Sequence, residues 1–274
     1  MNDQHRRFKA SVLFCITDKG FYEKYSKNIY PLYSGRAIVY NEIYRREEMD
    51  GMTEIEQRIR AAQNPVALTG AGISAPSGIP TFQGTWKGRP IRSFLSREYF
   101  ETHRIEFFEL YIEMVSWCQK QPNPAHLALA EWGLPIITQN IDGLHHKAGS
   151  RKIYELHGSL RTLSCPKCGK VIEARPFAED LKAAYAVRDY RAVGEKLRCS
   201  CSGLWETDVV LYGDAVRHME EAYELSARAD LMLVVGSSLT TYPAAALPDV
   251  ARRHGAEVIL VNDDCVGHLT GQGG

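Results

Sequence analysis

Short apolar runs alternate with longer amphipathic segments along most of this chain. Apolar runs typical of buried strands cover residues 66–69, 134–138, 153–156, 208–212, 231–235 and 258–261. Helical spacing of apolar residues covers residues 107–120, 124–132, 177–193, 216–229 and 244–254. Because buried strands that alternate with helices build a parallel sheet covered on both faces, this pattern predicts an α/β fold with a doubly wound sheet.

The first 52 residues depart from this pattern, since they are rich in tyrosine and show no sustained periodicity. Regular structure is predicted to begin at Thr53, which can cap a helix together with Glu56 in a capping box. Two interpretations of residues 1–52 stay open: an accessory extension, or an incorrect start with Met49 or Met52 as the first residue. The main domain is predicted over residues 53–274.

Composition excludes some classes of protein. The 33 basic side chains balance 33 acidic ones, so the zero net charge gives no overall attraction to nucleic acid or membranes. No segment approaches the roughly 20 apolar residues that span a bilayer, and the N-terminus lacks a secretory pattern. These observations predict a cytoplasmic protein with no membrane association and no direct binding of nucleic acid.

Four of the seven cysteines form two close pairs. Cys165 and Cys168 are followed, after thirty residues, by Cys199 and Cys201. Two thiolate pairs on tight turns can close a tetrahedron around zinc, and four thiolates leave no open position for a catalytic water. The pattern predicts a structural zinc site in a small module over about residues 159–206. The alternative is a degenerate knuckle that no longer holds metal.

A glycine-rich turn follows the first strand of the regular region. Gly70-Ala71-Gly72 opens a loose G-x-G-x-x-A pattern that ends at Ala75. Such a turn lets backbone N–H groups approach a pyrophosphate, although a purely structural turn explains the same residues. No acidic residue follows a second strand at the usual distance, so the fingerprint of an ordinary dehydrogenase is incomplete.

Two further polar groups follow strands. Gln139, Asn140 and Asp142 come after the strand at 134–138, at the edge where ligands bind in open α/β sheets. They could grip a ribose or a carboxamide, or simply form local turn and cap hydrogen bonds. His157 ends the strand at 153–156 beside a glycine, where it could be a general base, although a lone histidine is more often structural. His126, at a helix start, is given the structural interpretation.

In this order the motifs resemble the sirtuins, the family of NAD-dependent protein deacylases. The resemblance runs from about residue 53 to 262. It rests on the following motifs: Gly70-Ala71-Gly72-Ile73-Ser74 with Ser77-Gly78-Ile79-Pro80, Gln139-Asn140-Ile141-Asp142, His157-Gly158, the four cysteines, Asp208-Val209-Val210 with Gly213-Asp214, and Gly236-Ser237-Ser238-Leu239 with Pro243-Ala244-Ala245.

The resemblance implies a Rossmann-like domain with an inserted zinc-binding domain, and a cleft between them where NAD meets an acylated protein or peptide. It implies these cofactor-binding residues: Gly70, Ala71, Gly72 and Ser74 at the pyrophosphate; Ile79, Asn140 and Asp142 at the nicotinamide; Gln139 at its ribose; Gly236, Ser237, Ser238 and Asn262 on the adenosine side; and Phe82 and Gln83 beside the reacting centre. A peptide strand would pair with Val209, Val210 and Leu211.

The implied reaction makes His157 and Asn140 the catalytic residues. The acyl oxygen of the substrate lysine attacks the anomeric carbon of the ribose, and nicotinamide leaves. His157 then takes a proton from the ribose hydroxyls, so that a sugar oxygen attacks the acyl carbon. The products are free lysine, nicotinamide and O-acyl-ADP-ribose. A base in this position is worth roughly 10²–10⁴ in rate.

Three departures from the family pattern affect this expectation. Thr81-Phe82-Gln83-Gly84 stands where the family has Asp-Phe-Arg-Gly, and an amide cannot replace the forked, charged contacts of an arginine. A loss of about 1–3 kcal/mol in cofactor or transition-state binding is expected. Met114 stands three residues after Tyr111, where members that prefer acidic acyl groups have arginine, so neutral acyl chains are expected. The chain also ends soon after Asn262, which predicts weak NAD affinity.

These departures keep two other functions open. Weaker ordering of the cofactor favours mono-ADP-ribosyl transfer or NAD hydrolysis, in which a protein side chain or water accepts the ribose. A non-catalytic module that binds NAD or peptide is the third possibility, although such a module needs no base at His157. The sequence does not predict the oligomeric state.

Overall fold

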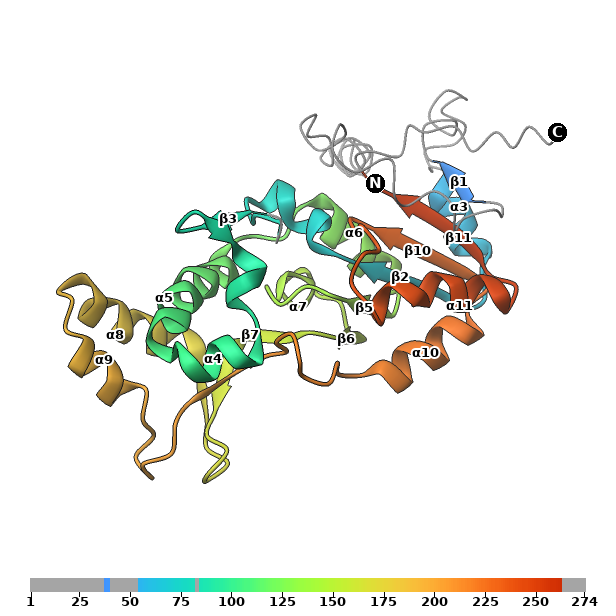
Figure 1. The fold of residues 1–274 in the computed structure, drawn as a ribbon. Helices are drawn as coiled ribbons and strands as arrows, with labels where there is room; N and C mark the ends of the chain where they lie inside the picture. Colours follow the sequence, from blue (N-terminus) through green and yellow to red (C-terminus); the bar gives the residue numbers. More distant parts are fainter. Residues whose placement is uncertain (1–36, 40–53, 82–83, 263–274) are drawn as a thin grey trace.

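The computed structural model describes residues 37–39, 54–81 and 84–262. Its centre is a six-stranded parallel sheet in the order β1-β11-β10-β2-β5-β6 (Figure 1). These strands are β1 (Ala37–Val39), β2 (Pro65–Thr69), β5 (Ile136–Thr138), β6 (Ile153–Glu155), β10 (Leu231–Val235) and β11 (Glu257–Val261). The predicted doubly wound parallel sheet is confirmed, because strands are added first on one side of β2 and then on the other.

Helices cover both faces of this sheet. On one face, α3 (Glu54–Ala61) and α6 (Pro124–Trp132) pack against side chains of β2, β10 and β11. On the other face lie α10 (Met219–Arg228) and α11 (Leu247–Arg253), the latter preceded by the 3-10 turn η6 (Ala244–Ala246). Both faces of β2 and β10 are therefore buried, which is why their sequences are continuous apolar runs rather than alternating ones.

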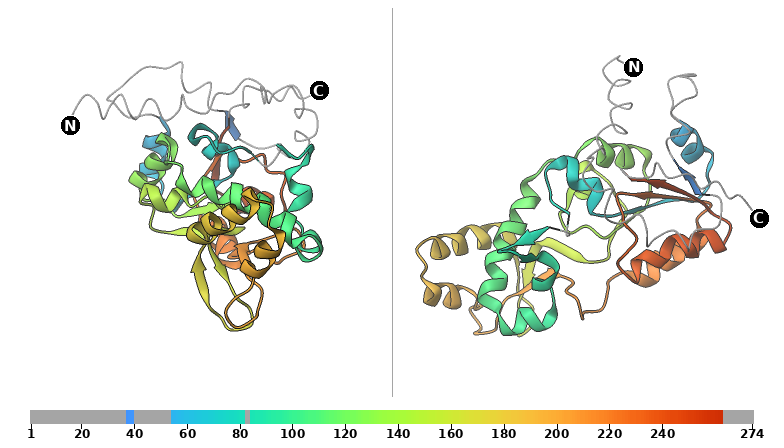
Figure 2. Two further views of the ribbon diagram at one scale, coloured as in Figure 1. Left: turned by 90° about the vertical axis from the view of Figure 1, so that its left-hand side faces the viewer. Right: turned by 45° about the horizontal axis from the view of Figure 1, so that its top comes forward.

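A second lobe lies at the other end of the molecule, where α8 and α9 project away from the parallel sheet (Figures 1 and 2). It contains an antiparallel sheet in the order β8-β7-β9, formed by β7 (Gly158–Ser164), β8 (Val171–Glu173) and β9 (Glu206–Val209). The helices α8 (Ala174–Ala186) and α9 (Tyr190–Lys196) are inserted between β8 and β9.

An earlier chain segment completes the core of this lobe. The segment contains the hairpin of β3 (Thr85–Trp86) and β4 (Arg89–Pro90), the turns η4 (Ile91–Phe94) and η5 (Ser116–Gln119), and the helices α4 (Arg97–Thr102) and α5 (Arg104–Val115). Its aromatic side chains share one hydrophobic cluster with β7, α8 and two of the cysteines. The small lobe is therefore built from two separate stretches of chain.

The structure corrects some predicted element boundaries. The single helix expected over 177–193 is two helices, because Arg188 has a φ of 55° and Asp189 caps α9 by accepting a hydrogen bond from the Ala192 N–H. The strand expected at 208–212 lies at Glu206–Val209 instead. The sequence patterns also gave no indication of α4 or of α7 (Leu144–Ala148).

The expected capping box at Thr53 lies outside the described residues. The division between residues 1–52 and 53–274 stays a prediction, although three residues of the first part form β1 and pair with β11. Among the helices that the structure describes, none has the length and apolar character needed to cross a membrane.

Candidate active site and metal site

The candidate residues of the large lobe lie at the carboxyl ends of neighbouring strands. Thr69 pairs with Thr138 and with Val235, and Val235 in turn pairs with Val261. The strand register therefore aligns the residues that follow: Gly70 after β2, Gln139 after β5, His157 shortly after β6, Gly236 after β10 and Asn262 after β11. This edge of an open parallel sheet is the usual place for a ligand.

Two glycine turns meet where the strand order reverses, between β2 and β10. The Gly72 N–H donates to the Gly236 carbonyl at 2.8 Å. A Cβ atom on Gly72 would lie 2.8 Å from the Gly236 Cα, and one on Gly236 would lie 2.1 Å from the Ile73 nitrogen. Gly236 also has a φ of 63°, which favours glycine. Only glycines allow these backbones to approach so closely, as the loops that hold a pyrophosphate require.

Ser237 connects the strand ends on both sides of this contact. Gln139 Nε2 donates to Ser237 Oγ at 3.2 Å, and Asn262 Nδ2 donates to the Ser237 carbonyl at 2.8 Å. The next residue, Ser238, is exposed and its hydroxyl pairs with Thr240 Oγ1. Hydrogen bonds thus connect the residues that follow β5, β10 and β11 into one polar surface at the strand ends.

Ser74, in the first glycine-rich motif, connects to two polar residues of the motif that follows β5. It lies in the 3-10 turn η3 (Ala71–Ser77), donates to Asp142 Oδ2 at 2.7 Å and accepts from Asn140 Nδ2 at 3.1 Å. Burial raises the pKa of Asp142, while hydrogen bonds from the Leu144 N–H and Ser74 oppose that rise. A small, partly open pocket lies beside this network, lined by Ala71, Ser74, Ile79, Pro80, Trp117, Asn140, Ile141 and Asp142. Trp117 is a lining residue that no sequence motif predicted.

His157 is held in one orientation by the strand that carries Gln139. Its Nδ1 lies 3.0 Å from the Gln139 carbonyl, which can only accept, so Nδ1 donates the proton. In the neutral ring the lone pair is then at Nε2. Burial lowers the pKa of His157, and the Gln139 carbonyl only partly offsets this effect. The imidazole is therefore neutral near pH 7 and able to accept a proton.

Two buried histidines support this site from below. His126 Nε2 lies 3.4 Å from Ser74 Oγ, and His145 Nε2 lies 2.9 Å from Thr69 Oγ1, which donates to Thr138. The two rings are 4.9 Å apart, and neither Nδ1 has a partner among the described residues. Burial lowers the pKa of His126 to about 4 and that of His145 well below the usual range. Both rings are neutral, in agreement with the structural interpretation of His126.

The predicted peptide-binding residues lie where β9 leaves the small antiparallel sheet. Val209 is the last residue of β9, and the Val210 N–H donates to the His157 carbonyl at 2.8 Å. The Leu211 N–H is bound by the Asp214 carboxylate at 3.0 Å. This segment therefore lies directly beside His157. Phe82 and Gln83 lie outside the described residues.

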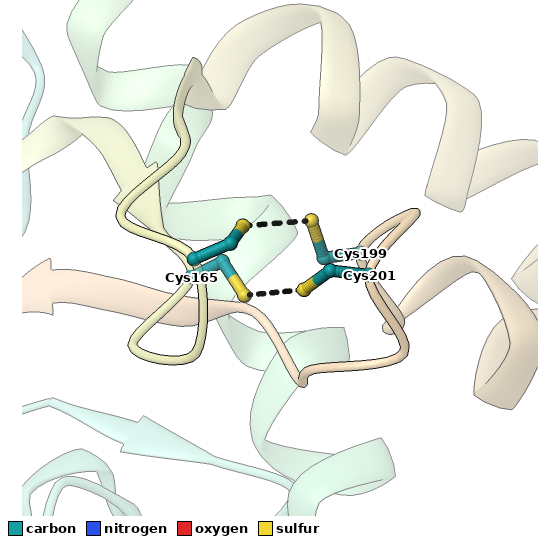
Figure 3. A group of neighbouring side chains, drawn as sticks. Cys165, Cys199 and Cys201 are labelled. Carbon is teal, nitrogen blue, oxygen red and sulfur yellow. Dashed lines mark hydrogen bonds between the residues drawn. The ribbon is translucent and has the colours of Figure 1, made fainter.

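The four cysteine sulfurs come together as the sequence predicted. Cys165 and Cys201 are 3.5 Å apart, Cys168 and Cys199 are 3.7 Å apart, and all four sulfurs lie within 4.8 Å of one another. Figure 3 shows the pairs facing each other from two loops. Zinc with four thiolates at about 2.3 Å requires sulfurs about 3.8 Å apart, so the cluster is compatible with structural zinc.

Gly203 completes the metal site in a way that the sequence did not reveal. Its N–H donates to Cys201 Sγ at 3.4 Å, and a Cβ atom there would lie 2.6 Å from Cys165 Sγ. A hydrogen bond from the Cys201 backbone N–H lowers the pKa of Cys199, whereas hydrogen bonds with the neighbouring thiols raise the pKa of Cys168, so the sulfurs titrate as one group.

Comparisons with known proteins agree with this geometry. The sequence model of the Sir2 family matches residues 70–243. A protein of Sulfolobus acidocaldarius named NAD-dependent protein deacetylase is 37% identical, over 77% of this chain and 83% of its own length. The NAD-dependent protein deacylase 2 of Archaeoglobus fulgidus is 39% identical, over 78% of this chain and 85% of its own length.

Solved structures give the same result. A structure described as Sir2 with a p53 peptide and NAD+ has a TM-score of 0.67 and 34% identity, and the match covers 79% of this chain and 87% of that one. A structure of Sir2Tm bound to a propionylated peptide has a TM-score of 0.65 and 36% identity, with 76% and 85% covered.

We expect the purified protein to contain one zinc ion per chain and the Cys199→Ser variant to contain almost none, because three thiolates hold zinc less tightly than four. Mass spectrometry of the metal content measures this. Cys118→Ser, which changes a cysteine outside the cluster, is the control and should keep its zinc. Full zinc occupancy in Cys199→Ser would contradict the four-thiolate site.

We also expect acid to destabilise the fold through the buried histidines. Because the folded-state pKa of His126 lies below its unfolded value, its contribution is complete above pH 6.5 and is lost as pH falls towards 4. The shift corresponds to a loss of about 3 kcal/mol in the free energy of unfolding. Denaturant titrations of His126→Gln should therefore show a smaller loss between pH 7 and 4. His254→Gln, at an exposed position, should lose as much stability as the wild type. Equal losses in the free energy of unfolding in the wild type, His126→Gln and His254→Gln would show that His126 is not the source of the acid sensitivity.

Proposed function

The chain belongs to the Sir2 family, and on this premise we propose that it is an NAD-dependent protein-lysine deacylase with neutral acyl-lysine substrates. With the consumption of one water, its products would be free lysine, nicotinamide and O-acyl-ADP-ribose. The observation that carries the proposal is the position of His157. Its Nδ1 is bound by the carbonyl of Gln139, which directly precedes Asn140, and its own carbonyl accepts from the Val210 N–H in the segment that follows β9. Among the described residues no hydrogen bond uses its Nε2, which is therefore free to act as a base.

The residues at the strand ends fit a dinucleotide. When bound, NAD supplies an electrophilic anomeric carbon and a nicotinamide leaving group. We assign the pyrophosphate to the turn of Gly70, Ala71, Gly72 and Ser74, where the glycine contact leaves room for the backbone to approach. Gln139, Gly236, Ser237, Ser238 and Asn262 would serve the riboses and the adenosine side, because they form one connected polar surface.

We assign the carboxamide of nicotinamide to the small pocket beside Ser74, because an amide and a carboxylate line it. Asp142 would accept from the amide N–H groups, and Asn140 would bind beside the reacting carbon. Their mutual contacts through Ser74 fix both side chains before any ligand arrives, so little ordering entropy is lost on binding. Ile79 lines the same pocket and is buried, which would keep water from the reacting centre.

His157 would act as the general base. Its Nδ1–H is fixed on the Gln139 carbonyl, so the ring presents Nε2 to a ribose hydroxyl. The lowered pKa keeps that nitrogen unprotonated at neutral pH. A proton taken at Nε2 would make the sugar oxygen nucleophilic towards the acyl carbon.

The peptide would bind along the segment after β9, with Val209, Val210 and Leu211 as its nearest strand. Among the described residues the Val210 carbonyl has no hydrogen-bond partner, and the Gly213 N–H likewise has none. An extended peptide can use these groups in the manner of an added strand. The four cysteines would have a structural role only, because a zinc ion with four thiolates has no free position.

A second candidate function is mono-ADP-ribosyl transfer or NAD hydrolysis. The observation that favours it is Gln83, which replaces an arginine of the family pattern. A third, non-catalytic role is less consistent with a partly buried His157 whose ring is held in one orientation, since a pure binding module needs no base there. The cytoplasmic location is a further proposal, supported by clustered thiols that suit a reducing compartment.

The test is mass spectrometry of a reaction that contains the protein, NAD and an acetyl-lysine peptide. Free lysine peptide together with O-acetyl-ADP-ribose is the expected result. Nicotinamide and free or protein-bound ADP-ribose with intact peptide would establish the second candidate instead. No nicotinamide release at all would leave only a binding function.

We expect His157→Ala to lower the rate of deacylation by a factor of roughly 10²–10⁴ while NAD still binds, because the variant removes the base but leaves the proposed NAD-binding residues in place. Turnover assays and calorimetric titration with NAD measure the two effects. His254→Ala, at an exposed position, is the matched control. Wild-type turnover in His157→Ala would refute the catalytic role.

We expect Gln83→Arg to improve the use of NAD, because a guanidinium supplies the forked and charged contacts that an amide lacks. A restored charged hydrogen bond of about 1–3 kcal/mol corresponds to a rise of roughly 5- to 150-fold in kcat/KM for NAD. Gln63→Arg, at an exposed position, controls for the added charge. An unchanged kcat/KM would mean that Gln83 does not limit cofactor use.

A further inference from the structure

The segment after β9 is fixed on its far side by the start of α4. The Tyr212 N–H donates to the Leu95 carbonyl at 2.9 Å, and the Arg97 N–H donates to the Tyr212 carbonyl at 3.0 Å. Ser96 lies opposite Tyr212 in a parallel bridge, and its hydroxyl caps α4 by accepting from the Tyr99 N–H. The main chain of Tyr212 is therefore already paired, so the helix and this segment form one unit.

Asp214 closes the same segment into a turn. Its N–H donates to the Leu211 carbonyl at 2.9 Å, and its carboxylate accepts from the Leu211 N–H at 3.0 Å. Gly213, between them, has a φ of 105°, a conformation that favours glycine. A turn of this shape gives up chain entropy that local contacts must offset.

Arg97 supplies the strongest of these contacts. Its Nε donates to Asp214 Oδ1 at 2.8 Å, and its Nη2 donates to Asp214 Oδ2, also at 2.8 Å. Its guanidinium lies 5.1 Å from the centre of the Phe100 ring. Glu206, on β9, lies 3.5 Å from Nη1. The side chains of Arg97 and Asp214 are 30% and 21% exposed, so solvent screens the pair less than a surface ion pair. Hydrogen bonds from Arg97 hold the pKa of Asp214 below its usual range.

This arrangement leaves main-chain groups available on the opposite side. Tyr212 and Gly213 are exposed, and neither the Val210 carbonyl nor the Gly213 N–H is used within the described residues. The direction in which these two groups point depends on the backbone angles of the turn. The antiparallel sheet ends at Val209, and beyond the bond from the Val210 N–H to the His157 carbonyl those angles are fixed by contacts to Leu95, Arg97 and Asp214.

We propose that Arg97 and Asp214 are positioning residues for the peptide, which hold residues 210–214 in the conformation that presents the Val210 carbonyl and the Gly213 N–H to it. The proposal rests on the proposed deacylase function. Neither side chain touches the reacting atoms. Without the ion pair the turn samples other conformations, and peptide binding must restore the order. The effect therefore falls on the affinity for peptide and not on the chemical step.

The first test is steady-state kinetics of Arg97→Ala, Asp214→Asn and the double variant with an acetyl-lysine peptide and NAD. We expect the peptide KM to rise about tenfold in each, as for other truncated charge pairs, with kcat and the KM for NAD within about twofold of wild type. The double variant should be no worse than either single one, because both changes break the same contact. Arg97→Lys, which keeps the charge but loses the fork, should give an intermediate KM.

Arg175→Ala is the matched control, because it removes an exposed arginine–glutamate pair from α8 in the same lobe. Its peptide KM should equal that of the wild type. An unchanged peptide KM in Arg97→Ala, a fall in kcat alone, or additive effects in the double variant would overturn the proposal.

A second measurement tests the role of the Arg97–Asp214 ion pair independently of the proposed function. Amide hydrogen exchange of residues 210–214 should be faster in Arg97→Ala than in wild type, while exchange in the core strands β2 and β10 stays the same. Equal exchange rates in the two proteins would show that the Arg97–Asp214 pair does not order residues 210–214, and would overturn the proposal whatever activity the protein has. A wild-type protein that neither binds nor turns over the peptide would instead refute the deacylase function, and the peptide role with it.

Discussion

The geometry of the candidate site depends on the contact of two backbones at the ends of β2 and β10. Gly72 and Gly236 share a hydrogen bond of 2.8 Å, and a Cβ atom on either would overlap the other turn. Because side chains are excluded there, the chain turns sharply into η3 and brings Ser74 over the end of β5. The positions of Asn140 and Asp142, and of the pocket beside them, follow from that turn.

Most buried polar atoms near the site satisfy one another, and the exceptions in this network are the Nδ1 atoms of His126 and His145, which have no partner among the described residues. Ser74 serves Asp142, Asn140 and His126, while Thr69 serves Thr138 and His145. In a region of low dielectric, each of these hydrogen bonds is worth more than in water, and each loss would leave a costly unpaired group. The network is thus a rigid support, and its hydrogen bonds require the rings of His126 and His145 to stay neutral. The same argument explains why two neutral imidazoles lie side by side.

Sequence patterns predicted the central part of the molecule well. The strands β2 and β10 are continuous apolar runs, the glycine turns follow them directly, and the cysteine spacing indicated the metal cluster, all of which depend on local sequence. The small lobe was predicted less well. Nothing in the spacing of residues near Arg97 indicates that its partner, Asp214, lies 117 residues later. Likewise, the positive φ angle of the single residue Arg188 divides what the sequence pattern predicts as one helix. Contacts of this kind depend on how distant segments pack, which periodicity does not encode.

The shared core of the small lobe has a consequence for how the molecule can be taken apart. The aromatic side chains of α4 and α5 pack in the same cluster as Leu160, Leu163 and Leu181 of the cysteine-bearing segment. A fragment cut out at the ends of β7 and β9 would therefore lose half of its own interior and expose an apolar face. The cysteine-bearing segment therefore cannot be exchanged between relatives by itself. A chimeric protein should take α4, α5 and the cysteine-bearing segment from the same parent.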